Sequence, residues 1–401
     1  MSERMTAPSK RAVAAFLLIV AAATGGSLAH WRARTVAVQA GGPAMPVAAA
    51  SAGPMVAVSG AAAVSSSSRA SSPAVAVAAT GAGPDAEDMQ IPPEGLDVCG
   101  VRRVPANELR RWKADPVFGK AQMQEIDEQT QRIGAAGLAR ISARLAAGND
   151  RQQVAARLLM QDRDGAALLA ERSTDPQAYQ MALTACGGLG GGTPNCALLN
   201  PRRWAELDPT DARPWLRLME AAHLRNDAVG VDAALAEAAV RTRLSRGSFL
   251  LEAQAAAVAD VLPDAAALGH ALVVVIGIDA AMPGLDVSAP LRVCKGDGLR
   301  DATRLRHCRA LASQTLANAT DITDAQIALK LAERAGVPRE QQAHDAATLK
   351  AAQDRFVERA IQDFNVDCDS MRRLKRLSIE RAASGELAMA LALLPPLQPA
   401  R

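Results

Sequence analysis

Six cysteines are the residues of this 401-residue chain whose spacing suggests chemistry most directly. None of them belongs to a Cys-x-x-Cys pair, so the spacings of zinc ribbons and thioredoxin-type redox motifs do not occur. Their even number predicts disulfides if the chain is exported to an oxidising compartment. Spacing indicates two local pairs, each flanking a glycine-containing turn: Cys186 with Cys196, and Cys294 with Cys308.

Two cysteines, Cys99 and Cys368, remain after the local pairs are assigned. By elimination they would join the start of the folded part to its last helices. The alternative is two separate thiols, or bridges to a partner protein. Each local bridge closes a short loop and should stabilise the fold by about 3 kcal/mol in the chain-entropy model.

An apolar run, Ala12 to Ala29, indicates that the chain is exported. It is 18 residues long, uncharged and preceded by Lys10 and Arg11, which suits a marginal membrane span. Residues 1–34 are therefore predicted to form an N-terminal signal anchor. Cleavage after Ser27-Leu28-Ala29 is the alternative, and it would release the protein into the periplasm. The positive charges before the run slightly favour a cytoplasmic N-terminus.

The composition places the rest of the chain in a bacterial envelope. Arginine greatly outnumbers lysine in an alanine-rich sequence, which is typical of a GC-rich bacterial genome. We therefore expect a single-pass protein of the inner membrane with its C-terminal domain in the periplasm, and this organisation resembles that of bacterial envelope proteins. Residues 35–90 are rich in Ala, Ser, Gly and Pro and are predicted to be a disordered linker.

Charge argues against nucleic acid as a partner. The segment before Asp85 has a formal net charge of +5 and the whole chain has +3, so the remainder has a net charge of −2. The basic character thus belongs to the targeting end, and no basic stripe interleaved with aromatic residues is present.

Residues 91–395 are predicted to form an all-α domain of antiparallel helical hairpins, arranged as a repeat-like superhelix or an irregular bundle. Ala, Leu, Arg, Glu and Gln dominate this part, and these residues lose least in a helix. The β-like segment Leu272 to Ile278 lies within a longer alanine-rich run and is interpreted as a buried helix. A further helix should begin at Asp321 or Thr323 and end at Gly336.

Two Asp-Pro dipeptides, Asp175-Pro176 and Asp208-Pro209, stand 33 residues apart, close to the length of one helix–turn–helix repeat. The second is followed by Trp215-x-x-Leu218, an Asn226-Asp227 turn and Val231-x-x-x-Leu235. The segment from about 177 to 243 therefore resembles tetratricopeptide repeats. It departs from their pattern at three positions, Met219, Ala222 and Val231, where the family has glycine, an aromatic residue and alanine.

This resemblance implies stacked helix pairs with a concave face that binds a protein or peptide. In the repeat register, Cys186 falls on a first helix and Cys196 on the second, where paired helices approach most closely. The candidate binding residues are Trp204, Trp215, Tyr179 and Arg217. The alternative for the tryptophans is that they fill gaps between helices.

The sequence contains no catalytic signature, so we expect a protein-interaction module that is not an enzyme and has neither cofactor nor metal. No pair of histidines has the spacing of a helix-borne metal site. His270 is predicted to be a hydrogen-bonded core residue. The alternatives are a periplasmic enzyme, whose cleft would gather His270, His307 and carboxylates, and a structural envelope spacer.

Overall fold

The computed structural model describes residues 91, 93–187, 193–244, 249–262, 264–282, 288–363 and 366–395. The chain divides into Met1–Gln90 and Ile91–Arg401, and every described residue belongs to the second unit. The predicted signal anchor and linker lie outside the described residues. Within the described part, no helix has the length and apolar character needed to cross a membrane.

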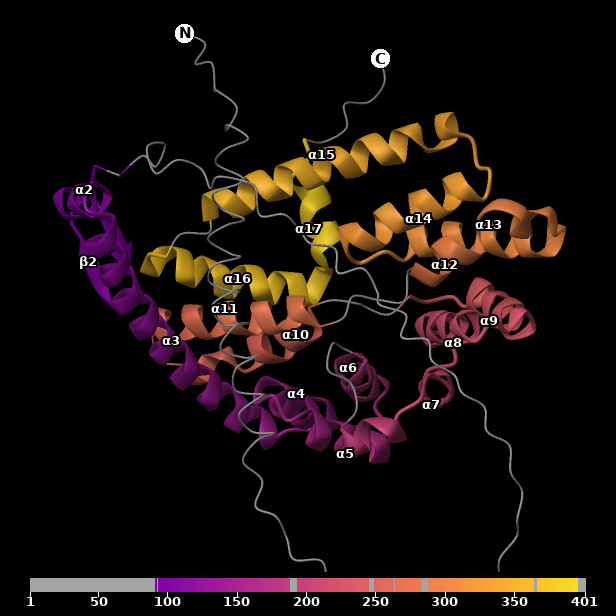
Figure 1. Cartoon of the computed structure of the whole chain (residues 1–401), viewed down its shortest axis with the longest axis horizontal. Helices are drawn as coiled ribbons and strands as arrows, with labels where there is room; N and C mark the ends of the chain where they lie inside the picture. Colours follow the sequence, from indigo (N-terminus) through magenta and orange to yellow (C-terminus); the bar gives the residue numbers. More distant parts are fainter. Residues whose placement is uncertain are drawn as a thin grey trace, which may run out of the picture. The chain divides into compact units, whose positions relative to one another are not determined.

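Helices make up nearly all of the described secondary structure, as the composition predicts (Figure 1). The first half of the domain contains α2 (Ala106–Ala114), α3 (Pro116–Ala146), α4 (Asp150–Leu159), α5 (Arg163–Arg172), α6 (Pro176–Cys186), the 3₁₀ helix η2 (Pro194–Leu198), α7 (Pro201–Leu207), α8 (Arg213–Leu224) and α9 (Ala228–Val240). The second half contains α10 (Leu250–Ala257), η3 (Ala259–Val261), α11 (Ala265–Ala281), α12 (Ser288–Val293), η4 (Gly296–Arg300), α13 (Ala302–Ala317), α14 (Ile322–Arg334), α15 (Arg339–Asp363), α16 (Cys368–Ser384) and α17 (Glu386–Ala392).

A short β-hairpin precedes the helices and is a feature that the all-helical prediction does not include. Strand β1 (Leu96–Val98) pairs antiparallel with β2 (Arg102–Val104), and Gly100 adopts a φ of +75° in the turn between them. Val98 and Val104 pack with Trp112 of α2 and Ile126 of α3. The hairpin thus forms a small apolar cluster with the first helices.

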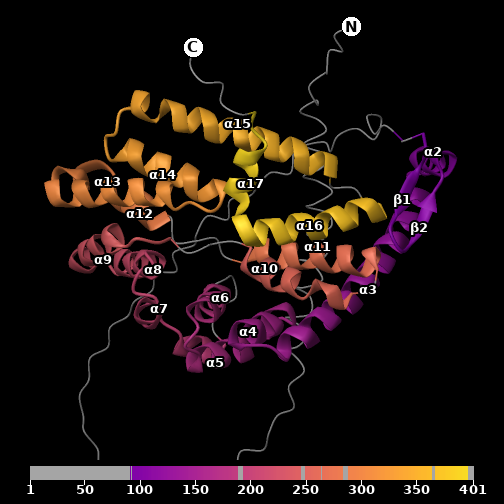
Figure 2. The same cartoon turned by 180° about the vertical axis from the view of Figure 1, so that it is seen from behind.

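The first core, as we name it, surrounds α11 and contains residues of α3 to α7, α10, α11 and α16. Helices α3, α10 and α16 pack on α11, and Figure 2 shows α10, α11 and α16 side by side. Two glycines of α3 permit the approach: a Cβ at Gly134 would lie 3.2 Å from the carbonyl oxygen of His270, and one at Gly137 only 2.5 Å from that of Ala267. The prediction of a buried helix over Leu272 to Ile278 is confirmed.

The second core lies between α8, α9, α12, α13 and α14. Helices α8 and α9 form an antiparallel hairpin whose turn contains Asn226 with a φ of +56°. The Asp227 carboxylate accepts the N–H of Gly230 at 2.8 Å and so begins α9. Helices α9 and α13 also pack together. The predicted helix–turn–helix at Asn226-Asp227 is therefore present as a hairpin.

Helices α14, α15 and α17 form a smaller apolar cluster. Asp321 caps α14 by accepting the N–H of Asp324 at 2.8 Å, which agrees with one of the two predicted starts. Gly336, with a φ of +75°, follows the end of that helix. Helix α15 buries Leu349 and Ala352.

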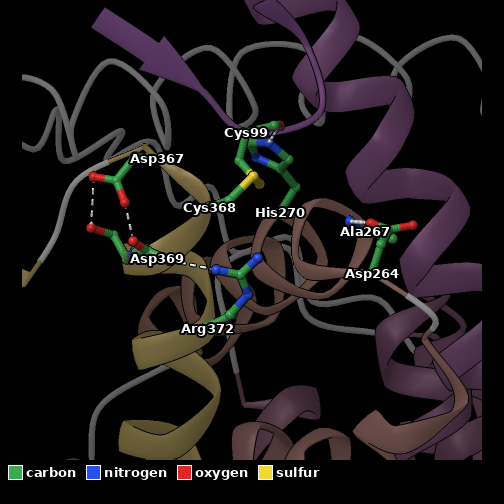
Figure 3. Close-up of a disulfide and its surroundings, with 9 residues drawn as sticks. Cys99, Asp264, Ala267, His270, Asp367, Cys368, Asp369 and Arg372 are labelled. Atoms are coloured by element: carbon green, nitrogen blue, oxygen red, sulfur yellow. Dashed lines mark hydrogen bonds and ion pairs between the residues drawn. A yellow bond between two sulfur atoms is a disulfide. The ribbon is translucent and has the colours of Figure 1, made fainter. Parts of the chain in front are cut away.

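All six cysteines are joined in disulfides, in the pairs that spacing and elimination predict: Cys186–Cys196, Cys294–Cys308 and Cys99–Cys368. The last bridge joins the β-hairpin turn to the start of α16 (Figure 3). The repeat register needs a correction, because Cys196 lies in the five-residue η2 and not in the second α-helix of a pair. Pro194 and Pro201 each stand in the first turn of a new helical segment, so one continuous helix cannot run through Cys196.

Candidate interaction surface

Two of the predicted binding residues, Tyr179 and Trp204, lie inside the first core, which corrects their proposed surface role. Each is 1% exposed. The Tyr179 hydroxyl, on α6, accepts the N–H of Asn200 at 2.9 Å and fixes the residue that caps α7. Burial raises the pKa of Tyr179, so it remains an uncharged phenol. Large aromatic residues with a satisfied polar tip stabilise a core well, and here they hold α6 and α7 together.

The other two predicted residues, Trp215 and Arg217, are half-buried on α8. Trp215 packs against the second core, and the guanidinium of Arg241 lies 5.1 Å from its ring centre. Arg241 in turn donates to the carbonyl of Pro209 at 2.7 Å and pairs with Glu237. Arg217 faces the end of α6, where a Cβ at Gly187 would lie 3.0 Å from its Nη1. The structure therefore does not gather the four predicted residues into one exposed face.

An apolar stripe on α9, which sequence reasoning missed, is exposed on this hairpin. Val229 is 82% exposed and Val240 is 66% exposed, although both are aliphatic. Between them lie Ala233, exposed, and Ala236, half-buried. The spacing of i, i+4, i+7 and i+11 places all four on one side of the helix. Leu224, at the end of α8, adds a side chain that is 72% exposed.

Packing explains why this stripe faces outward. Helix α9 contacts α8 and α13 through its opposite side, where Val231, Leu235 and Ala238 are buried. The α9 sequence is apolar on nearly all sides, so its composition alone does not reveal which side meets the core. The exposed side could have been found in the sequence from a second set of aliphatic residues with helical spacing. This set lies on the opposite side of the helix from Val231, Leu235 and Ala238.

The charges on either side of the stripe are already neutralised within the chain. Asp232 pairs with Arg304 of α13 through two contacts of 2.7 Å. Glu237 pairs with Arg241, one turn further along α9. The pairs define two polar edges, and the stripe between them has no charge of its own. A surface of this kind suits an apolar helical partner better than a charged ligand.

The histidines proposed for the alternative enzyme belong to different helices. His270 on α11 is 7% exposed, and its Nε2 lies 3.0 Å from the carbonyl oxygen of Cys99 (Figure 3), which agrees with a hydrogen-bonded core residue. His307 is on α13 and adjoins the bridged Cys308. Among the residues that the structure describes, no group of three or more His, Cys, Asp or Glu side chains is placed to hold a metal ion.

A small cavity lies in the second core beside the ion pair of Arg213 and Asp324. Its volume is about 10 Å³, and Leu216, Leu311 and Leu331 contribute to its lining. A space of this size accommodates about one water molecule. It is too small for an organic substrate.

Comparisons with models of protein families, with curated proteins and with solved structures find no match to this chain.

Proposed function

We propose that this chain is a protein of the bacterial inner membrane, anchored through residues 12–29, whose domain binds a protein partner in the periplasm. The α9 stripe is the observation that carries the proposal of a binding role. The three disulfides support export, because such bridges form and persist in oxidising compartments. Secretion into the periplasm after cleavage of the anchor is the alternative for location.

The partner that fits the stripe is an amphipathic helix with an aliphatic face. Alanines at Ala233 and Ala236 leave room for a second helix to approach closely, and Val229 and Val240 provide larger contacts at either end. One helix face buries a modest area, so we expect a reversible complex and not an obligate one. The paired charges of Asp232 and Glu237 would form the polar rim of the contact.

The binding role is tested by Val229→Asp together with Val240→Asp in the full-length protein. Charges on the stripe should abolish co-purification of the partner from membranes and prevent photo-crosslinking from a probe at Ala233. The stability of the domain should change by less than about 0.5 kcal/mol per site, since both side chains are exposed.

The matched control is Val117→Asp, because Val117 is 83% exposed but lies on α3. This variant should retain the crosslink from Ala233. Equal crosslinking of the same protein by the double variant and by the control would contradict the proposed surface.

The proposed location is tested separately by fractionation, N-terminal mass determination and thiol alkylation. We expect intact protein in the inner membrane with no free thiol before reduction. Intact protein in the cytosol with six reactive thiols would refute export and leave the α9 surface to be judged by itself.

A further inference from the structure

A cluster of buried acids meets a single arginine where α10, α11 and α16 come together. Glu252 of α10 is 1% exposed and Asp279 of α11 is 6% exposed. Arg381 of α16 reaches Glu252, with its Nη1 3.1 Å from Oε2. Glu386, at the start of α17, is a third carboxyl near the same arginine and is partly buried.

Hydrogen bonding within this cluster is incomplete. Asp279 accepts the backbone N–H of Glu252 at 3.0 Å, which connects the two helices. The second carboxylate oxygen of Glu252, Oε1, has no hydrogen-bond partner among the described residues, and neither has Nε of Arg381. The guanidinium is held over Phe249 at 4.6 Å and near Phe356 at 6.0 Å from the ring centres.

The charges of this cluster do not balance when both deeply buried acids are ionised. One guanidinium then faces two carboxylates, and an uncompensated buried charge is costly. Burial is the main cause that raises the pKa of Asp279, to about 7, and the charge of Glu252 acts in the same direction. Burial also raises the pKa of Glu386. A proton is therefore the species that restores the balance near neutral pH.

Charged groups reach Asp279 from two of the three helices that pack on α11. Glu252 is supplied by α10 and Arg381 by α16. Helix α3 packs through Gly134 and Gly137 against Ala267 and His270, and no group of α3 is among the causes that shift the pKa of Asp279. The charge balance at Asp279 thus depends on α10 and α16.

We propose that Glu252, Asp279 and Arg381 form a proton-operated latch, closed when Asp279 is protonated and loosened when Asp279 ionises beside Glu252. In the closed state, Arg381 pairs with Glu252 and holds α16 against α10 and α11. Loss of the proton puts two negative groups next to each other, and the packing of α16 and α10 weakens. This device is independent of the α9 surface and of the compartment.

Hydrogen exchange of the full-length protein tests the latch by comparing wild type with Asp279→Asn. Asparagine keeps an oxygen that can accept the N–H of Glu252 but cannot ionise. After correction for intrinsic rates, we expect amide protection in α10 and α16 to fall at least about tenfold in wild type between about pH 5 and about pH 8, the equivalent of one pKa unit. Protection in the variant should change less than about twofold, which is within the 0.5 kcal/mol expected of unrelated sites.

Two further measurements keep the test decisive. Glu252→Gln removes the opposing negative charge and should move the wild-type transition to lower pH. Asp324→Asn, in the second core, should leave the transition in α10 and α16 unchanged. Equal pH dependence in wild type and Asp279→Asn would overturn the latch, and so would a transition that Glu252→Gln does not move. Constant protection of α10 and α16 in wild type would also overturn it.

Discussion

The two cores of the domain each contain one short-range disulfide and one buried arginine–carboxylate contact, but they differ in how deeply these links are buried. In the second core, Arg213 and Asp324 pair at 2.5 Å with side chains 1% and 2% exposed, and both Cys294 and Cys308 are fully buried. In the first core, one arginine serves two buried acids, and the bridge between Cys186 and Cys196 is only half-buried. The second core is thus locked by deeply buried links, whereas the links of the first core are more accessible to solvent and to thiols.

The largest effect is expected when the locked pair is broken. Arg213→Ala would leave the buried carboxylate of Asp324 without its partner, and Arg213 joins α8 to α14 across 111 residues of sequence. We predict a loss of about 3–5 kcal/mol in the free energy of unfolding, measured by urea denaturation. The matched control is Arg157→Ala, which breaks an exposed pair with Asp162 and should cost less than about 1 kcal/mol.

Equal losses for Arg213→Ala and Arg157→Ala would show that the second core is not locked by its ion pair. In that case, the two cores would differ only in the exposure of their short disulfides. A loss of amide protection confined to α8 and α14 would instead show that the ion pair is a local clamp between these two helices.

A second prediction concerns the two short disulfides. Mild reductant should open Cys186–Cys196 before Cys294–Cys308, because thiolates reach a half-buried bridge more easily than a fully buried one. Alkylation followed by peptide mass determination would give the order. Loss of either bridge should cost about 3 kcal/mol at most in the chain-entropy model. Simultaneous opening of both bridges would mean that the cores unfold as one unit.

Much of the fold could be predicted because its signals are local. Asn226-Asp227 marks a turn and Asp321 caps a helix, and both act on neighbouring backbone groups. The length and apolar character of the run around Leu272 identify α11 in the same way. Disulfide spacing was informative because the partners in two of the bridges stand 10 and 14 residues apart.

The features that could not be predicted depend on contacts between distant segments. Glu252 and Arg381 are 129 residues apart, and neither lies in a motif. Tyr179 and Trp204 were assigned to a surface because aromatic residues suit both cores and interfaces, and only the packing of α6 and α7 decides between them. The β-hairpin was missed because each of its strands is three residues long, too short for an alternating pattern to show.

The smallest predicted effect separates the two buried acid sites by pH. Burial raises the pKa of Asp324 to about 6, and Asp321 acts in the same direction, while the pairing with Arg213 opposes them. In the unfolded chain this carboxyl loses its proton at about pH 4. The contribution of Asp324 to the free energy of unfolding therefore falls as the pH rises from about 4 to about 6. For Asp279 the same fall continues to about pH 7. Asp324→Asn should therefore remove a slope of about 1.4 kcal/mol per pH unit from the lower window and leave the slope between about pH 6 and about pH 7 to Asp279. Urea unfolding at a series of pH values measures both slopes. The slopes are compared, and not the absolute free energies of unfolding, because the variant also removes the ion pair with Arg213. An unchanged slope below pH 6 would mean that the folded protein does not hold the Asp324 proton, and that the two cores respond to pH only through the acids around Arg381.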